Sequence, residues 1–324
     1  QENGYEDIIP VSGGVAVLDD EFKRKINDEN AEVPFMNIKN GKVFRKLDYV
    51  GDLIGKYAFL AKESGEVDFH SGDDSRVVRI DIGREGELTK DAAGKLSLIY
   101  HHKDFTRDDL LACFRINIQR GYIAIQEMNA YLEKTLDVLL KKHSLSRLSA
   151  NRYQVKEAVE NKIDQIVDSM TSKKFAELVS DKSIIAAGEC FHFGDQIRLP
   201  SICRDNFNKH LYEKAGQMNK EELELAYQLN GLSNVLWWFR NPDVNGFYIQ
   251  GWLKHKFYPD FIVKTKKGNY FVLEYKGEHL LGSDDTGYKE KIGQKWQDLA
   301  GKGYTFALIE KTKINAALES ILKA

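Results

Sequence analysis

The sequence predicts a mixed α/β protein in three parts: a β-rich N-terminal region (residues 1–104), a helical subdomain (residues 105–180) and a C-terminal α/β domain (residues 181–324). Short alternating runs of apolar residues mark the first part, and apolar residues at helical spacing mark the second. In the third part, helices alternate with runs rich in aromatic and β-branched residues, which is typical of a compact α/β unit. A chain of 324 residues is long enough for two or three domains with cores of their own.

The composition is that of an ordinary soluble protein. No apolar run approaches the roughly 20 residues of a membrane helix, and no signal-peptide pattern opens the chain, so we expect no membrane partner. The three cysteines, Cys113, Cys190 and Cys203, are odd in number and lack CxxC spacing. This pattern favours reduced thiols and a cytoplasmic location. The first residue is Gln, which indicates a processed chain or a fragment of a longer one.

The N-terminal region carries no catalytic motif. Helical spacing is found at residues 49–62. Alternating runs predict four short strands, at 15–18, 33–38, 76–82 and 96–100. The histidines in loops are expected to be solvated rather than metal ligands; they are His70, His101 and His102.

The helical subdomain begins at a capping box formed by Thr106 and Asp109. Apolar periodicity then predicts three amphipathic helices, at about 106–118, 126–142 and 153–170. Their apolar stripes are interpreted as core. The alternative is a connector that packs against a part of the protein outside this chain.

The C-terminal domain alternates strands and helices. Strands are predicted at 191–198 (ending at Pro200), 235–240, 247–252, 257–263, 270–275 and 304–310. Helices are predicted at 206–212, 220–232, 288–300 and 314–322, with a flexible loop at 281–287.

The segment from Lys256 to Gly277 predicts a β-hairpin, because two aromatic and β-branched runs flank the turn signal at 266–269. With the turn centred on Lys267, Asp260 faces Glu274. Side chains two apart on a strand share a face, so Lys276 points the same way as Glu274. Directly opposed positions lie about 5 Å apart, which is close enough for two carboxylates to share a divalent cation.

These residue types suit phosphodiester hydrolysis. A divalent metal lowers the pKa of bound water and acts as a Lewis acid, and Mg²⁺ prefers one or two carboxylates with several retained waters. Asp260 and Glu274 are the predicted ligands, helped by the carbonyl of Tyr275. Lys276 is predicted to hold the attacking water and the scissile phosphate and to stabilise the developing charge. The alternative is that Glu274 and Lys276 are an ordinary pair on a solvated strand face, without a catalytic role.

Pro259-Asp260, followed after thirteen residues by Glu274-Tyr275-Lys276, resembles the signature of the PD-(D/E)xK nuclease superfamily. The order of NFNKHLY, the Glu222 helix, WWFRNP, KFYPDFIV and LEYKG resembles the C-terminal endonuclease region of type III restriction enzyme Res subunits and related helicase–nuclease proteins. The likeness is closest from about residue 206 to residue 300. It implies a restriction-endonuclease-like αβββαβ core that cuts double-stranded DNA with Mg²⁺.

The resemblance also implies further site residues. The superfamily often adds an acidic residue from the helix before the strands; Glu222 is our choice because it shares a face with Leu225, Ala226 and Leu229, and Glu224 is the alternative. Residues of the helix after the lysine often touch the phosphate backbone, and here they are Lys289, Lys291, Gln294 and Lys295.

The same family implies partners, namely an upstream ATPase motor and a methyltransferase that recognises the sequence. This chain has no GxxxxGK[ST] loop and no DExx-type box, so ATP would enter only through a motor in a longer parent chain.

The local charge distribution gives weak support for DNA binding. Residues 251–324 hold 13 lysines and 9 acidic residues, whereas the whole chain has a net charge of −2. Lys254 and Lys256 lead into the site strand and are predicted to contact phosphates without reading bases. Trp237 and Trp238 could stack on bases, but on so apolar a strand at least one of them is expected to be a core residue. A zinc site at Cys190, His192 and Cys203 lacks a fourth ligand.

Two hypotheses follow. The first is an Mg²⁺-dependent DNA endonuclease with Asp260, Glu274, Lys276 and Glu222 as catalytic residues. The second is a non-catalytic DNA-binding or scaffolding module of a helicase-like protein.

Overall fold

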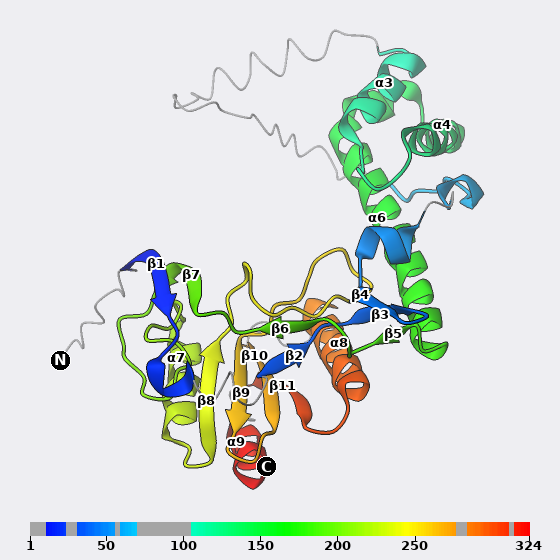
Figure 1. The fold of residues 1–324 in the computed structure, drawn as a ribbon. Coiled ribbons are helices and arrows are strands. Elements are labelled where there is room, and N and C mark those ends of the chain that lie inside the picture. Colours follow the sequence, from blue (N-terminus) through cyan, green and yellow to red (C-terminus); the bar gives the residue numbers. More distant parts are fainter. Residues whose placement is uncertain (1–10, 24–30, 56–58, 70–104, 277–283, 311–313) are drawn as a thin grey trace, which may run out of the picture. The chain divides into compact units, whose positions relative to one another are not determined.

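The computed structural model describes residues 11–23, 31–55, 59–69, 105–276, 284–310 and 314–324 (Figure 1). The predicted strands at 76–82 and 96–100, and the three loop histidines, lie outside the described residues, as does part of the loop at 281–287. The chain forms two compact units, one of residues 1–52 with 173–324 and one of residues 53–172. The predicted boundaries at residues 104 and 180 therefore differ from those of the compact units. Within the described residues, no helix is both long and apolar enough to cross a membrane.

A four-stranded mixed sheet forms the centre of the first unit. Its strands are β8 (Val235–Arg240), β9 (Phe261–Thr265), β10 (Tyr270–Lys276) and β11 (Tyr304–Glu310), in the order β11-β10-β9-β8. The pairs β8–β9 and β9–β10 are antiparallel, whereas β10 and β11 are parallel. The crossover from β10 to β11 contains helix α8 (Asp284–Ala300), as a parallel connection requires.

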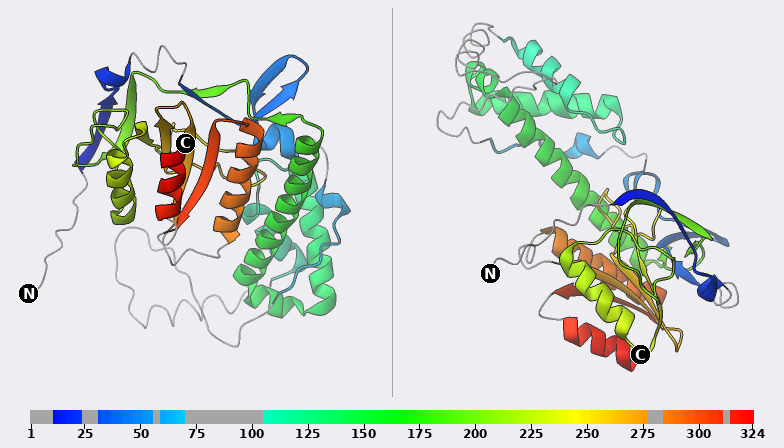
Figure 2. Two further views of the ribbon diagram at one scale, coloured as in Figure 1. Left: turned by 90° about the horizontal axis from the view of Figure 1, so that it is seen from below. Right: turned by 90° about the vertical axis from the view of Figure 1, so that its left-hand side faces the viewer.

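Helices cover both faces of this sheet, which explains why every residue of β9 and β10 is buried. Helices α7 (Lys220–Gly231) and α9 (Ile314–Lys323) pack on one face, in a core that includes Leu225, Phe261 and Ile321 (Figure 2). Trp296 of α8 contacts Tyr304 of β11 on the other face. The predicted helices at 220–232, 288–300 and 314–322 are confirmed, although α8 begins four residues earlier than expected.

The predictions for the segments 206–212 and 247–252 are wrong, and the single strand predicted at 191–198 is divided between two strands, at Cys190–His192 and Gln196–Ile202. The segment 206–212 is not a helix, because its backbone bonds to the free edge of β8: Trp238 N–H donates to the Lys209 carbonyl and Leu211 N–H to the Trp238 carbonyl, each at 2.8 Å. Residues 247–252 do not form a strand. A single bridge between Ile249 and Phe257 is all the regular pairing that this segment makes within the described part of the chain.

The N-terminal strands belong to the same unit, since they pair with residues 184–202. Strand β1 (Val11–Val17) pairs with β7 (Gln196–Ile202), and β2 (Glu32–Pro34) pairs with β6 (Cys190–His192). Strand β3 (Asn37–Asn40) pairs with β4 (Val43–Lys46) and with β5 (Ile184–Ile185). Pro200 lies inside β7 instead of ending it, because a strand of a two-stranded sheet has one edge that needs no donor.

The second unit is helical. It contains η2 (Leu60–Lys62), α3 (Arg107–Asn117), α4 (Ile125–Lys142), α5 (Leu145–Ala150) and the first part of α6 (Arg152–Ser180), and η1 (Tyr49–Ile54) spans its N-terminal boundary. The predicted capping box at Thr106 and Asp109 is confirmed. The predicted helix at 49–62 is reduced to the short helices η1 and η2, and α6 continues ten residues beyond the predicted end at residue 170. Buried apolar residues of α3, α4 and α6 form the core, among them Phe114, Leu132 and Val159.

Candidate active site

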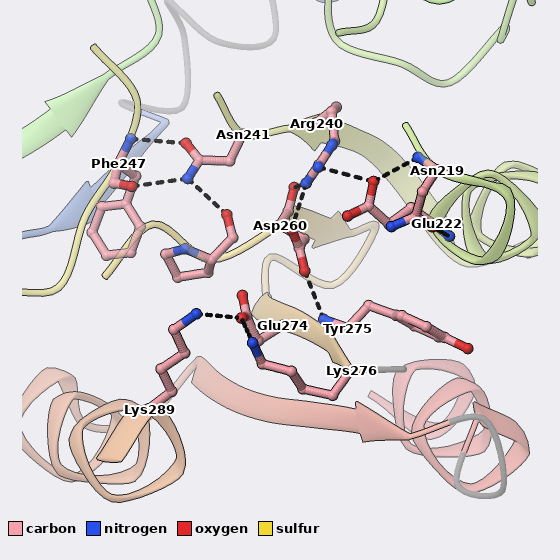
Figure 3. A network of polar contacts seen from close by, with 11 residues as sticks. Asn219, Glu222, Arg240, Asn241, Phe247, Asp260, Glu274, Tyr275, Lys276 and Lys289 are labelled. Atoms are coloured by element: carbon pink, nitrogen blue, oxygen red, sulfur yellow. Dashed lines mark hydrogen bonds and ion pairs between the residues drawn. The ribbon is translucent and has the colours of Figure 1, made fainter. Parts of the chain in front are cut away.

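The predicted hairpin register is correct. Strands β9 and β10 pair from Tyr270 opposite Lys264 to Leu273 opposite Phe261. Regular pairing ends there, so Asp260 lies just before β9 and its carboxylate turns toward β10. Asp260 Oδ2 accepts a hydrogen bond of 2.7 Å from the Tyr275 N–H (Figure 3). Asp260 therefore contacts β10 at the backbone of Tyr275, and the directly opposed Asp260–Glu274 pair that the register predicted lies beyond the last paired residues.

Glu274 is a buried carboxylate with only 4% of its surface exposed. Its Oε1 lies 3.2 Å from Nζ of Lys276 and 3.2 Å from Nζ of Lys289. Burial raises the pKa of Glu274 to about 7, and the nearby charge of Asp260 acts in the same direction against the two lysines. The interpretation of Glu274 and Lys276 as a pair on a solvated face is wrong, because helix α8 covers this face of β10.

Lysines 276 and 289 form a cationic pair around Glu274. Lys276 is 8% exposed, and Asp285 lies 3.8 Å from its Nζ and 3.2 Å from that of Lys289. Although burial acts to lower it, the charge of Glu274 raises the pKa of Lys289 above its ordinary value. Two ammonium groups thus converge on one carboxylate oxygen, at a position where an anion could also be bound.

Glu222 enters the site from the N-terminus of α7. It is the third residue of that helix, and its Oε2 accepts the backbone N–H of Asn219 at 3.0 Å in a capping box. Burial raises its pKa, and the charge of Arg240 opposes that effect. Glu222 is thus neither solvated nor free. The structure brings it to Asp260 through a shared arginine, Arg240, whereas the alternative, Glu224, is exposed on the same helix.

That arginine, Arg240, is the site residue that sequence reasoning missed. Its Nη1 donates to Asp260 Oδ1 at 2.8 Å and its Nη2 to Glu222 Oε2 at 3.0 Å. The available signal was a charged residue at the end of the otherwise apolar run VLWWFR. An arginine at the last position of a buried strand has to find anionic partners at the strand end.

The other predicted DNA-binding residues lie outside this cluster. Lys254, Lys256, Lys291 and Gln294 are exposed. The Lys256 ammonium lies 4.0 Å from the centre of the Tyr248 ring. Lys295 lies 4.0 Å from Asp298. Of the six predicted DNA contacts, Lys289 alone is tied to the carboxylates in the described structure.

Trp237 and Trp238 are 1% and 0% exposed and are core residues, so neither stacks on a base. Among the described residues, no group of three or more His, Cys, Asp or Glu side chains could hold a metal ion.

The donor set nevertheless fits a hard divalent cation. Asp260 and Glu274 are two carboxylates close enough for the charge of one to raise the pKa of the other, and a cation between them would relieve that repulsion. Mg²⁺ is commonly bound by one or two carboxylates plus waters and substrate phosphates, so a third protein carboxylate is not needed. No family model matches the chain, and neither a curated protein nor a solved structure is significantly similar to it.

Proposed function

We propose that this protein is an Mg²⁺-dependent DNA endonuclease of the PD-(D/E)xK type. The observation that carries the proposal is the pair of carboxylates on neighbouring strands, Asp260 and Glu274, with the Lys276 ammonium 3.2 Å from Glu274. All three are largely or fully buried beside the end of one hairpin. A buried charged cluster is costly unless it has a function or dense pairing.

The order of elements supports a restriction-endonuclease-like core. Helix α7, strands β8, β9 and β10, helix α8 and strand β11 follow one another in the αβββαβ order, with β10 and β11 parallel. In this interpretation Asp260, Glu274 and Lys276 are the three signature residues, and Glu222 is the added acid from the preceding helix.

The proposed metal ligands are Asp260 and Glu274, together with the carbonyl of Tyr275. When bound, Mg²⁺ would supply a water of lowered pKa and a Lewis acid for a phosphodiester oxygen. The lysines have their own task. Lys276 and Lys289 are both ion-paired with Glu274, and their ammonium groups would attract the phosphate and stabilise the negative charge that grows on its oxygens. Burial strengthens this effect because little water screens the charges.

Four lysines and one glutamine complete the proposed DNA contact. Lys254 and Lys256 precede β9, and Lys291, Gln294 and Lys295 follow the site along α8. Their flexible side chains suit phosphates, which position a duplex without reading its sequence. We propose double-stranded DNA as the substrate. An ATPase motor and a methyltransferase remain proposed partners of a longer parent protein, and ATP would be used only by such a motor.

A plasmid assay tests the proposal. The full chain is expected to nick or cut supercoiled plasmid in Mg²⁺ and to lose this activity in EDTA. Asp260→Asn and Lys276→Met should each lower the rate by about 100-fold or more, because each removes a charge that acts on the transition state. The matched controls Asp243→Asn and Lys302→Met, both at exposed positions, should cut like the parent. Equal cleavage by Asp260→Asn and the parent would refute the proposal.

One observation favours the second candidate, a non-catalytic DNA-binding or scaffolding module. The charged groups of the cluster already satisfy one another: Arg240 bridges Glu222 and Asp260, and two lysines neutralise Glu274. Such a module would bind DNA equally well with or without EDTA. It would also bind normally after Asp260→Asn and would show no cleavage.

A further inference from the structure

Two lysines at the end of β10 and on α8 are shared between two carboxylates. Nζ of Lys276 and Nζ of Lys289 each lie 3.2 Å from Oε1 of Glu274 (Figure 3). The same two ammonium groups lie 3.8 Å and 3.2 Å from Oδ2 of Asp285, the second residue of α8. Each ammonium group therefore contacts two carboxylate oxygens that belong to different residues.

The two carboxylates differ in exposure. The side chain of Glu274 is 5% exposed, whereas that of Asp285 is 62% exposed. Removing one partner of a buried ion pair is strongly destabilising because the other charge is left without compensation. An exposed pair contributes little net stability, since water solvates both groups when they separate. Asp285 is therefore the carboxylate that can leave the lysines at low cost, and Glu274 is the one that keeps them in place.

The charges of this cluster match one further anion. Two ammonium groups face the single carboxylate of Glu274, which leaves one positive charge for a second partner. The nearby Asp260 is ion-paired with Arg240 instead. In the structure the second partner is Asp285, and a phosphodiester group of DNA likewise carries one negative charge. Its oxygens also accept charge-assisted hydrogen bonds from ammonium groups.

We propose that Asp285 occupies the binding position of one DNA phosphate and that this phosphate displaces its carboxylate from Lys276 and Lys289 when DNA binds. The inference rests on the proposed function, since DNA is taken as the ligand. Before the exchange, Asp285 is an autoinhibitory contact that lowers the affinity for DNA. After it, both lysines are still paired and the exposed carboxylate is solvated.

DNA binding in EDTA tests the proposal without cleavage and without a metal ion. The probe is a short fluorescein-labelled duplex oligonucleotide, and its affinity for the full chain is measured by fluorescence anisotropy. Asp285→Asn keeps the size of the side chain and removes the charge that competes with phosphate. It is expected to bind the duplex about fivefold more tightly than the parent, which is the effect of one exposed ion pair.

The same change in a Lys289→Met protein separates exchange from simple repulsion. A repulsive charge at Asp285 would act on DNA whether or not Lys289 is present, so the two effects would multiply. If Asp285 acts by occupying Lys289, Asp285→Asn should alter the affinity of the Lys289→Met protein by less than about twofold. Lys289→Gln takes the place of Lys289→Met if the latter fails to fold. Equal effects in both backgrounds, or an Asp285→Asn protein that binds no more tightly than the parent, would overturn the proposal.

Asp298 gives a matched control on the same helix. Its side chain is 57% exposed and lies 4.0 Å from Nζ of Lys295, whose own side chain is 42% exposed. Because neither group of that pair is buried, Asp298→Asn should change the affinity by less than about twofold. An equal gain for Asp298→Asn and Asp285→Asn would show a general charge effect and overturn the proposal.

The plasmid assay distinguishes this inference from the nuclease itself. The expected set of affinities together with no cleavage in Mg²⁺ would refute the nuclease and support the phosphate position. Cleavage by a parent protein whose DNA affinity does not respond to Asp285→Asn would overturn the exchange alone. A parent that neither binds nor cuts DNA would overturn both proposals.

Discussion

The backbone N–H of Arg240 donates a hydrogen bond to Nε2 of His210 at 3.1 Å, while Nδ1 of the same ring lies 2.7 Å from the carbonyl oxygen of Tyr212. Because Nε2 accepts, the neutral ring carries its proton on Nδ1 and donates it to Tyr212. The imidazole thus ties the segment at the edge of β8 to Arg240, the strand residue that bridges Glu222 and Asp260. Burial lowers the pKa of His210 from 6.5 to about 4.

This lowered pKa predicts an acid-sensitive fold. The native state keeps His210 neutral, so its contribution to stability is complete above about pH 6.5 and is lost as the pH falls toward 4. The full loss is at most about 3 kcal/mol, since one pKa unit corresponds to about 1.4 kcal/mol. Urea unfolding of the parent and of His210→Gln between these pH values should show a steeper fall for the parent.

The quantity to compare is the difference in unfolding free energy between the two proteins at each pH, because other groups titrate in the same range. His210→Gln is expected to be less stable than the parent at neutral pH, since it loses the contact of the ring with Trp238 at 4.7 Å. If the unfolding free energy fell equally with pH in both proteins, His210 would not be the cause of the acid sensitivity.

Glu274 predicts the pH dependence of metal binding. Its pKa is raised from 4.5 to about 7, so the protein gains stability from the neutral carboxyl at low pH and loses that gain as the pH rises through 7. A cation needs the ionised form. Mn²⁺ affinity should therefore increase by up to about tenfold per pH unit up to pH 7 and level off above it. Glu274→Gln should abolish this dependence, and a parent protein with a flat profile would contradict the prediction.

Gly293 lies where helix α8 packs closely against strand β11, so we expect a larger side chain at this position to destabilise the protein. A Cβ at this position would lie 2.3 Å from the Phe306 ring, so Gly293→Ala should destabilise the protein by about 1–3 kcal/mol through overpacking. Gly287 is on the same helix, and a Cβ there would meet nothing within 4 Å. Gly287→Ala should be neutral or stabilising by up to about 1 kcal/mol, because alanine favours the helix. Thermal unfolding of both variants gives the comparison, and similar shifts in both would refute the close contact.

The pairing of distant strands predicts that residues 181–324 do not fold well alone. That piece lacks β1, β2 and β3, which pair with β7, β6 and β5. It also lacks Pro34, whose carbonyl accepts from Trp296 Nε1 at 2.7 Å. Expressed alone, it should aggregate or unfold without a cooperative transition by circular dichroism.

A chain in which a Gly/Ser linker joins residues 11–52 to residues 173–324 restores these contacts. It should unfold cooperatively. Cooperative unfolding of residues 181–324 alone would show that the N-terminal strands are accessory to the fold.

The sequence by itself determined what depends on neighbouring residues. The capping box at Thr106, the amphipathic helices and the β9–β10 register all follow from short-range periodicity, capping and turn chemistry, which act within a few residues. Because the register follows from the turn, the approach of Asp260 to Glu274 could be predicted as well.

The tertiary structure alone decided what depends on partners far along the chain. The segments 206–212 and 247–252 have local patterns of a helix and a strand, yet the edge of β8 and the surrounding loops determine their conformation. The pairing of β1–β3 with residues 184–202 spans more than 140 residues, beyond the reach of any local pattern. Arg240 is the clearest case: its charge is visible in the sequence, but only folding brings Glu222 and Asp260 to opposite sides of one guanidinium. The physical reason is that a buried charge is stabilised by whichever groups the whole fold places around it.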